Sequence, residues 1–322
     1  MDRSQKISGA DPGRNALIIG ATGLCGGALG ERLVRDGWSV RAFLRPGRSR
    51  QDLTFAADEI VFGGLLSQVE LEAAMVGMDV VIYFASTSVP ATSSRDPTIE
   101  FQASLTGLNN TLLAMSRTGV RRLVFPSSGG TVYGSVQTEV TEDQPLAPTS
   151  GYGLGKVLAE ETIRFYARTH GLIYTILRLT NVYGSAKRRQ SPQGVIDVFL
   201  DDALHGRTSQ IWGSLEIERD YLFVDDMAGA ICASLASEAA VDATFNVGAS
   251  HSVKLSEIVE QIQIVTEGRH LFELDVTKPS GVLRSAVDCR RIQQSTGWAP
   301  SFSLAEGIGQ TWRRKLAQAQ RR

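Results

Sequence analysis

The first half of the chain alternates short runs of β-branched and other apolar residues with longer helical stretches. The short runs are nearly continuous in Val, Ile and Leu, which is typical of strands covered on both faces. Such alternation predicts an α/β fold with a doubly wound parallel sheet. We expect strands at 16–20, 39–44, 59–62, 79–85, 122–127 and 173–179, with helices near 24–36, 68–77, 98–118 and 151–170.

A glycine-rich turn joins the first predicted strand to the first predicted helix. The stretch "GATGLCGG" places Gly20, Gly23 and Gly26 at this junction. These glycines permit a tight turn, close approach of a pyrophosphate and close packing of helix on strand. The amides and dipole at the helix N-terminus favour phosphates. Because a strand and a helix flank it near the start of the chain, the triplet indicates a dinucleotide-binding (Rossmann) sheet.

The end of the second predicted strand bears on which dinucleotide binds. An acid there holds the ribose 2′-hydroxyl of NAD, whereas a nearby arginine accommodates the 2′-phosphate of NADP. The chain has "FLRPGRSR" at this place, with Arg45 and Arg48 and no acid. These residues favour NADP, and the alternative is that both arginines are solvated loop charges.

Beyond Asn181 the pattern is less regular. A helix at 194–205, a strand at 221–226 that enters another helix, and a short strand at 244–248 predict a smaller α+β lobe interleaved with returns to the sheet. We expect a dinucleotide-binding domain at 15–180, with returns near 220–250. A substrate-binding lobe is expected at 181–219 and 251–322, and a disordered tail at 1–14.

Composition argues against several classes of protein. The formal net charge of −1 gives no basic field for nucleic acid. The three cysteines lack CxxC spacing and the four histidines lack ligand spacing, so no metal site is expected. The sequence has neither a run of about 18 apolar residues nor the apolar core of a secretory signal. We therefore expect no membrane span and a cytoplasmic protein.

Tyr152 and Lys156 in "YGLGK" lie four residues apart at the start of a predicted helix, and so on one face of it. A tyrosine acts as a general base near neutral pH only if its pKa, ordinarily about 10, is lowered. A neighbouring ammonium has this effect because it favours the phenolate. After a dinucleotide motif and a fifth strand that ends in "PSSGGTVYG", this pair indicates a reactive centre.

Eight stretches together carry a family resemblance that covers residues 16 to about 312. They are "GATGLCGG", "YFAS", "SSGGTVYG", "SGYGLGK", "LRLTNVYG", "RDYLFVDD", "FNVG" and "RSAVDCRRIQQSTGW". With them the chain resembles an extended short-chain dehydrogenase/reductase of the NAD-dependent epimerase/dehydratase family, which works on nucleotide sugars. The resemblance implies a homodimer formed through the helices near 98–118 and 151–170.

The resemblance also implies roles for individual residues. Tyr152 is the expected catalytic base, and Lys156 holds the nicotinamide ribose and lowers the pKa of the tyrosine. The implied cofactor-binding residues are Gly20, Thr22, Gly23, Leu24, Gly26, Arg45, Ala85, Ser104, Tyr152 and Lys156. The implied substrate-binding residues are Ser88, Asn181, Arg219 and Arg284. The two arginines suit a diphosphate, since each offers a planar fork of donors, and the alternative for each is a surface charge.

The sequence departs from the family pattern at three places. Members usually carry Ser or Thr four residues before the Tyr of "VYG", and that position is Gly129 here. The usual Asn three residues ahead of Gly107 is Ser104, and the acid after the second strand is missing. We predict that Ser128 or Thr131, or a water in the space left at Gly129, hydrogen-bonds the sugar hydroxyl instead.

The departures also bear on the reaction. In dehydratase relatives an Asp-Glu pair directly precedes "VYG", but Gly130 and Thr131 stand there in this chain, which disfavours dehydration. We expect a UDP-hexose type 4-epimerase that uses bound NAD through a 4-keto intermediate. One alternative is an NADPH-dependent reductase of a nucleotide 4-keto sugar. Another, from a different class, is a non-catalytic dinucleotide sensor.

Overall fold

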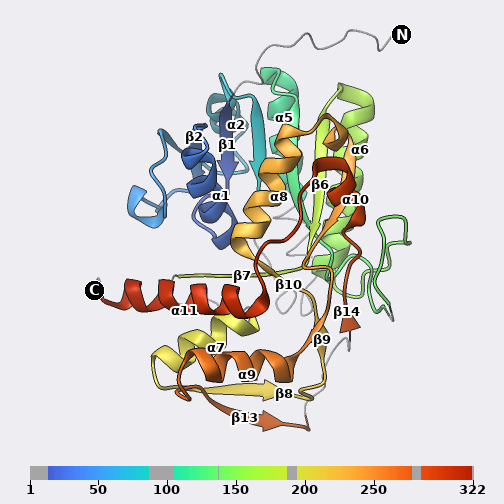
Figure 1. Cartoon of the computed structure of the whole chain (residues 1–322). Helices are drawn as coiled ribbons and strands as arrows, with labels where there is room; N and C mark the ends of the chain where they lie inside the picture. Colours follow the sequence, from blue (N-terminus) through green and yellow to red (C-terminus); the bar gives the residue numbers. More distant parts are fainter. Residues whose placement is uncertain (1–13, 87–104, 137, 187–193, 278–283, 321–322) are drawn as a thin grey trace.

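The computed structural model describes residues 14–86, 105–136, 138–186, 194–277 and 284–320. Its main feature is a seven-stranded sheet with the order β11-β6-β5-β4-β1-β2-β3, parallel throughout (Figure 1). From one edge to the other the strands are β11 Ala243–Val247, β6 Ile173–Leu179, β5 Arg122–Ser128, β4 Val80–Tyr83, β1 Asn15–Ile19, β2 Ser39–Leu44 and β3 Glu59–Phe62. The expected doubly wound parallel sheet is therefore confirmed.

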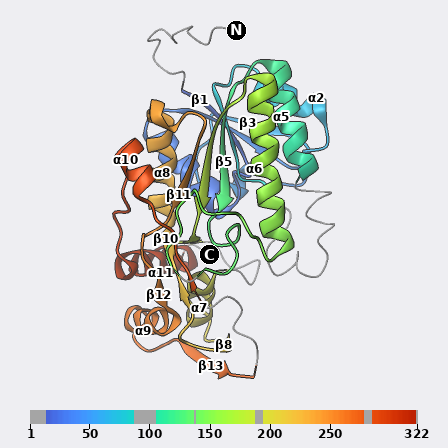
Figure 2. The same cartoon turned by 90° about the vertical axis from the view of Figure 1, so that its right-hand side faces the viewer.

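Helices cover both faces of this sheet (Figure 2). Helices α1 (Leu24–Arg35) and α8 (Val224–Ala236) pack on each other over one face, and α2 (Gln68–Met75), α5 (Thr106–Thr118) and α6 (Gly151–His170) cover the opposite face. Successive strand residues point to opposite faces. Ile18 of β1 accordingly lies in the core under α1, whereas Leu17 and Ile19 lie in the core on the other side. Burial on both faces explains why the strands are apolar throughout.

The helix bounds follow local signals in the sequence. Ser150 caps α6 by accepting a hydrogen bond from the Gly153 amide at 3.1 Å, and Gly171 ends the helix in the left-handed conformation. Helix α5 occupies the described part of the helix that we expect at 98–118, since residues 98–104 lie outside the described residues.

The strand order reverses between β1 and β4, which are neighbours in the sheet. In open α/β sheets, ligands bind outside the carboxyl ends of the strands at such a switch point. Gly20 follows β1 at this place, and Ala85 lies two residues beyond the end of β4. The topology therefore brings two predicted cofactor-binding segments to one crevice.

A smaller α+β lobe lies beyond the carboxyl ends of the central strands (Figure 1). Its strands form three small sheets, β10 with β7, β12-β9-β14, and β13 with β8. The elements of this lobe are β7 Asn181–Tyr183, α7 Val195–Leu204, β8 Thr208–Trp212, β9 Glu218–Arg219, β10 Tyr221–Phe223, β12 Val253–Lys254, α9 Leu255–Val265, β13 Leu271–Asp275, β14 Arg284–Ser285 and α11 Leu304–Gln320. Helix α10 (Arg290–Thr296) instead packs beside β11 and α8 of the large sheet. Two short 3₁₀ turns lie at Arg50–Asp52 and Glu238–Ala240.

The chain passes between the two parts more than once. After β10 it returns to the large sheet through α8 and β11, and it then re-enters the lower part at β12. A second lobe interleaved with returns to the sheet agrees with the expected fold class. The division of the chain into a dinucleotide-binding domain at 15–180 with returns near 220–250, and a substrate-binding lobe at 181–219 and 251–322, stays a prediction.

Candidate active site

The turn after β1 forms a cradle that only glycine can make. Gly20 has a φ of +94°, and a Cβ at this position would lie 3.0 Å from the backbone of Phe84 and Ala85. A Cβ on Gly26 would lie 2.4 Å from the carbonyl oxygen of Gly20. These two glycines therefore allow the backbone of the turn to approach both the end of β4 and the first turn of α1.

The N-terminus of α1 opens onto this cradle. Gly23 occupies the N-cap position without a side-chain hydrogen bond to the helix, and its own amide donates to the Gly20 carbonyl at 3.1 Å. Amides in the first turn of a helix, around Leu24 here, are suited to hold an anion. Thr22 lies in the turn between Gly20 and Gly23. The cradle and the open helix end together fit the pyrophosphate of a dinucleotide.

The two arginines in the loop after β2 have different surroundings. Arg45 is exposed directly after the strand. Arg48 is held by Asp52, with Nη1 and Oδ1 3.1 Å apart. Hydrogen bonding from the Ser49 amide, together with Arg48, lowers the pKa of Asp52. Sequence reasoning missed this acid because it lies eight residues beyond the strand. Arg45 is therefore the better candidate of the two for contact with a cofactor.

Lys156 links helix α6 to the end of β5. Its ammonium donates to the carbonyl oxygen of Pro126 at 2.9 Å. The same nitrogen lies 4.7 Å from the ring centroid of Phe125 and 5.7 Å from that of Tyr152. Lys156 also lines a small cleft together with Ala85. The structure thus brings Lys156, with the Tyr152 ring near it, to a cleft that Ala85 also lines, and Ala85 is the neighbour of Gly20 at the end of β4.

The turn after β5 explains one of its two glycines. The Gly129 amide donates to the Leu179 carbonyl at 2.7 Å, and a Cβ on Gly129 would lie 2.8 Å from the carbonyl oxygen of Arg178. A side chain at 129 would therefore collide with the backbone of β6. Gly130 has more space, since the nearest neighbour of an added Cβ is the Ser285 hydroxyl at 3.9 Å.

Thr131 places a buried hydroxyl beside the start of helix α6. Within the described residues its Oγ1 has no hydrogen-bond partner. Its carbonyl oxygen would lie 2.7 Å from a Cβ on Gly153, one residue after Tyr152. Ser128 is half-buried, and its carbonyl closes the turn by accepting from the amides of Thr131 and Val132. A buried hydroxyl without a partner is costly unless a ligand or water satisfies it.

The predicted substrate residues lie in the strands that join the two lobes. Asn181, in β7, is exposed and donates through Nδ2 to the Asp220 carbonyl at 2.8 Å. Arg219 and Arg284 lie on the neighbouring strands β9 and β14, but Arg284 is in register with Glu218 rather than with Arg219. Ser88 and Ser104 lie outside the described residues.

The environments of the two arginines differ. Burial lowers the pKa of Arg219, whose Nη1 donates to the Glu218 carbonyl at 2.8 Å. Arg284 is more exposed, and its Nε lies 3.3 Å from the Glu218 carboxylate. Residues side by side in adjacent strands share a face of the sheet, so the register places Arg219 and Arg284 on opposite faces. Because the Glu218 carboxylate already lies beside Arg284, the more buried Arg219 is the better candidate for binding a diphosphate.

Asp220 is a buried carboxylate that sequence reasoning passed over. Its Oδ1 accepts from the Ala249 amide at 2.8 Å and from the Thr180 hydroxyl at 3.1 Å. Its Oδ2 is buried and has no hydrogen-bond partner among the described residues. Burial raises the pKa of Asp220 to about 6. The signal was present in "RDYLFVDD", but only the arginine of that motif was given a role.

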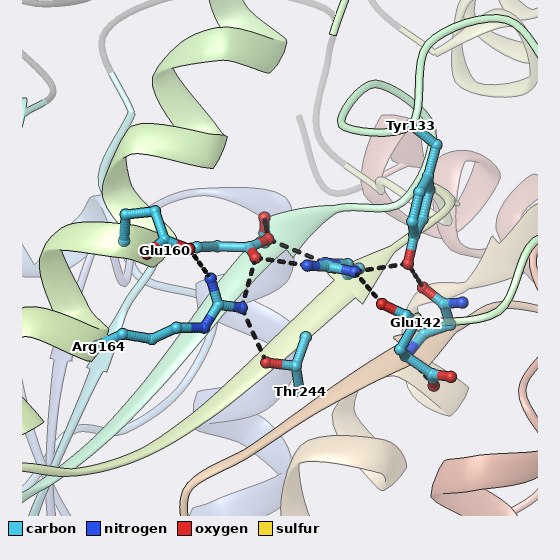
Figure 3. Close-up of polar contacts among 9 residues, drawn as sticks. Tyr133, Glu142, Glu160, Arg164 and Thr244 are labelled. Carbon is cyan, nitrogen blue, oxygen red and sulfur yellow. Dashed lines mark hydrogen bonds and ion pairs between the residues drawn. The ribbon is translucent and has the colours of Figure 1, made fainter. Parts of the chain in front are cut away.

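A buried polar network lies behind the reactive residues, again unpredicted (Figure 3). Glu160, one helical turn after Lys156, is fully buried and accepts from Arg178 Nε at 3.1 Å and from Arg178 Nη2 at 2.8 Å. The Ser127 hydroxyl donates to the same carboxylate at 2.6 Å. Burial by itself would raise the pKa of Glu160, but Arg178, with Ser127 and Arg164, holds it below its ordinary value.

The comparisons with known proteins agree with this arrangement. Residues 16–248 match the family described as the NAD dependent epimerase/dehydratase family. The chain belongs to this family, as the resemblance predicted. It is an NAD-dependent enzyme of the extended short-chain dehydrogenase/reductase type.

Individual relatives extend the comparison. The chain is 30% identical to the UDP-glucose 4-epimerase of Mycolicibacterium smegmatis over 304 residues, which covers 92% of this chain and 96% of that protein. It is 35% identical to a dTDP-4-dehydro-6-deoxyglucose reductase of Escherichia coli over 193 residues, 59% of this chain and 60% of that one. The structure of a Thermus thermophilus UDP-glucose 4-epimerase complexed with NAD superposes with a TM-score of 0.83 at 25% identity, covering 94% of this chain and 99% of that one.

The part of the chain that the structure describes contains neither a membrane-spanning helix nor a metal-binding cluster. No helix there combines the length and apolar character that a membrane span requires. No group of three or more His, Cys, Asp or Glu side chains in the same part of the chain could hold a metal ion.

Proposed function

We propose that the protein is a UDP-hexose 4-epimerase that uses bound NAD. The observation that carries this proposal is that Lys156, whose ammonium lies 5.7 Å from the Tyr152 ring centroid, lines the same small cleft as Ala85, and that the backbone of Ala85 borders Gly20 of the glycine cradle. Support comes from the M. smegmatis relative, which matches nearly the whole chain and is a UDP-glucose 4-epimerase.

The residues around the crevice have distinct roles in this proposal. The turn at Gly20, Gly23 and Gly26, with the first turn of α1, holds the pyrophosphate. Lys156, already anchored on Pro126, holds the nicotinamide ribose and favours the phenolate of Tyr152. Tyr152 takes the proton from the 4-hydroxyl of the hexose and later returns it. When bound, NAD supplies the hydride acceptor and donor for the carbon that carries this hydroxyl.

Thr131 supplies the hydroxyl that Gly129 cannot carry. Its Oγ1 is buried, lacks a partner within the described residues and belongs to the turn on which the first turn of α6 packs. Ser128 stays a second candidate for the same role. Asn181 and Arg219 contact the nucleotide-sugar, with Arg219 on the diphosphate. Arg284, in register with Glu218 on the other face, is the weaker candidate for substrate binding.

The proposal is tested with purified protein and UDP-glucose without added cofactor. We expect conversion to the 4-epimer, and we expect Tyr152→Phe to lower kcat by at least about 100-fold, because it removes the general base. Tyr166→Phe, on the same helix, is the matched control and should leave kcat unchanged. Normal turnover by Tyr152→Phe would exclude the proposed base.

The role of Thr131 is tested separately. Thr131→Val keeps the shape of the side chain and removes its hydroxyl, so kcat should fall about 10- to 100-fold. Ser128→Ala should have a smaller effect. If both variants keep the wild-type rate, Tyr152 acts without a side-chain hydroxyl partner.

An NADPH-dependent reductase of a nucleotide 4-keto sugar is the second candidate. Two observations favour it: the exposed Arg45 after β2, where NAD enzymes often carry an acid, and the E. coli reductase relative. Consumption of NADPH with a nucleotide 4-keto sugar, reduced by Arg45→Ala, would support this candidate. Protein that co-purifies with NAD and epimerises UDP-glucose would support the first.

We further propose a homodimer in the cytoplasm. Helix α6 exposes Leu154, Leu158 and Phe165, with 40%, 38% and 50% of their surface accessible. Exposed apolar side chains on one helix suit an interface between two copies. Sedimentation of the wild type and of a Leu158→Glu variant tests this, and a monomeric wild type would refute it.

A further inference from the structure

Helix α6 carries the proposed base, whereas the turn after β5 carries the proposed hydroxyl partner. The relative position of Tyr152 and Thr131 therefore depends on how this helix is fixed against the strand ends. The pair Tyr152 and Lys156 continues along the same face of the helix to Glu160, since each residue is four positions after the last. Lys156 contacts the Pro126 carbonyl of β5, and Glu160 adds side-chain contacts to the sheet one turn further along the helix.

The contacts of Glu160 reach two strands at once. Its carboxylate accepts from the Ser127 hydroxyl of β5 at 2.6 Å and from two nitrogens of Arg178 in β6. Arg164, from the next turn of α6, donates to Oε2 of the same carboxylate at 3.0 Å and to the Thr244 hydroxyl of β11 at 3.2 Å. The paired fork of Arg178 fixes the orientation of the carboxylate as well as its distance.

Arg178 continues the network into the turn after β5. Its Nη1 donates to the Tyr133 hydroxyl at 2.7 Å and to the Glu142 carbonyl at 3.2 Å. The Tyr133 hydroxyl in turn donates to Asn246 Oδ1 in β11 at 2.7 Å. Figure 3 shows Tyr133, Glu160 and Arg164 directed toward one shared centre. Tyr133 follows Ser128 and Thr131 in the turn after β5. The guanidinium of Arg178 therefore contacts both helix α6, through Glu160, and this turn, through Tyr133.

We propose that Glu160 and Arg178 are positioning residues for the reaction, because they lock helix α6, with Tyr152 and Lys156, onto the turn that presents Thr131. The proposal rests on the proposed function of Tyr152 and Thr131. We assign neither Glu160 nor Arg178 a contact with the cofactor or the sugar. They act through the geometry of the groups that make such contacts, and misplacement of about 1 Å in such geometry can cost up to about 100-fold in rate.

Two tyrosines of the chain give a matched test of this geometry. Tyr133 and Tyr166 are both buried, and each donates its hydroxyl to an asparagine, Asn246 at 2.7 Å and Asn109 at 3.2 Å. Only Tyr133 also contacts Arg178. Tyr133→Phe should lower kcat for UDP-glucose epimerisation about tenfold with KM within about twofold, since positioning rather than binding is lost. Tyr166→Phe should change neither.

A second arm does not depend on the identity of the sugar. Glu160→Gln removes a negative charge one helical turn after Lys156 and leaves the positive charges of Arg178 and Arg164, and a more positive surrounding favours the phenolate of Tyr152. The midpoint of the tyrosinate absorbance of Tyr152, obtained by subtracting the titration of Tyr152→Phe, should move to lower pH. The charged groups that face this network from other elements are Glu142 after the turn and Arg291 in α10, which pair with each other at 3.3 Å.

The outcomes separate the two proposals. If the wild type converts no UDP-hexose but the titration midpoint moves as expected, the substrate is wrong and the positioning role stands. If Tyr133→Phe behaves like Tyr166→Phe, or if Glu160→Gln titrates as the wild type does, the positioning role is overturned. Should Glu160→Gln fail to fold, Ser127→Ala removes one donor to the carboxylate and should lower kcat with little change in melting temperature.

Discussion

Two buried carboxylates in this protein, those of Glu160 and Asp220, have pKa values shifted in opposite directions. Glu160, on the buried face of helix α6, has two arginines and a serine as donors, and its pKa lies below the ordinary value. Asp220, where the second lobe meets the sheet, has only neutral donors, and burial raises its pKa to about 6. Burial is nearly complete at both sites. The comparison teaches that the partner, not the depth, decides whether a buried acid stays ionised.

The largest loss of stability is expected when Arg178, a cation that pairs with Glu160, is replaced. Arg178→Met leaves the Glu160 carboxylate buried with Arg164 as its remaining ionic partner, and the loss of one member of a buried pair costs about 3–5 kcal/mol. Urea unfolding at neutral pH measures this loss. The exposed pair Arg117–Glu72 is the control, because Arg117→Met should cost no more than about 1 kcal/mol. Equal costs for both variants would contradict the comparison.

The second prediction concerns how the free energy of unfolding depends on pH through Asp220, whose hydrogen-bond donors are neutral. Because the pKa of Asp220 is raised from 3.8 to about 6, folding favours its protonated form. The stability contributed by that form is complete below pH 3.8 and is lost as pH rises through about 6, a difference of about 3 kcal/mol. Asp220→Asn cannot titrate, so its unfolding free energy relative to wild type should rise over this window.

At Glu160 the dependence of stability on pH has the opposite sign. Because its pKa is lowered, the stability from its ionised form is present above the ordinary value of 4.5 and is lost as pH falls. Glu160→Gln should therefore differ most from wild type near neutral pH and least in acid. Parallel pH profiles for the Asp220→Asn and Glu160→Gln differences would show that the two sites are not distinct.

The smallest loss of stability is expected for substitutions at Gly129 and Gly130, the two adjacent glycines after β5. Gly129→Ala would bring a methyl group to 2.8 Å from the Arg178 carbonyl and so strain the strand that carries the network. Overpacking of this kind costs about 1–3 kcal/mol. Gly130→Ala meets nothing closer than 3.9 Å and should change the melting temperature little. Identical melting temperatures for the two variants would contradict the close approach of β6.

Much of the architecture could be predicted because its signals are local. The nearly continuous apolar runs of the strands, their alternation with helical stretches and the glycine turn before Leu24 indicate a parallel dinucleotide-binding sheet, and the structure confirms the parallel sheet. The spacing of Tyr152 and Lys156 likewise places both on one helical face. The individual site assignments stay predictions, although the structure brings Lys156 and Ala85 to one cleft.

The sequence by itself determined the strand-helix order, the cofactor turn and the Tyr-Lys pair, since each depends on residues only a few positions apart. The tertiary structure alone decided why residue 129 is glycine and which buried acids stay charged. Those answers depend on contacts between segments distant in the sequence, such as Gly129 with Arg178 and Asp220 with Ala249. Burial and charge pairing arise only when the sheet and the second lobe pack together.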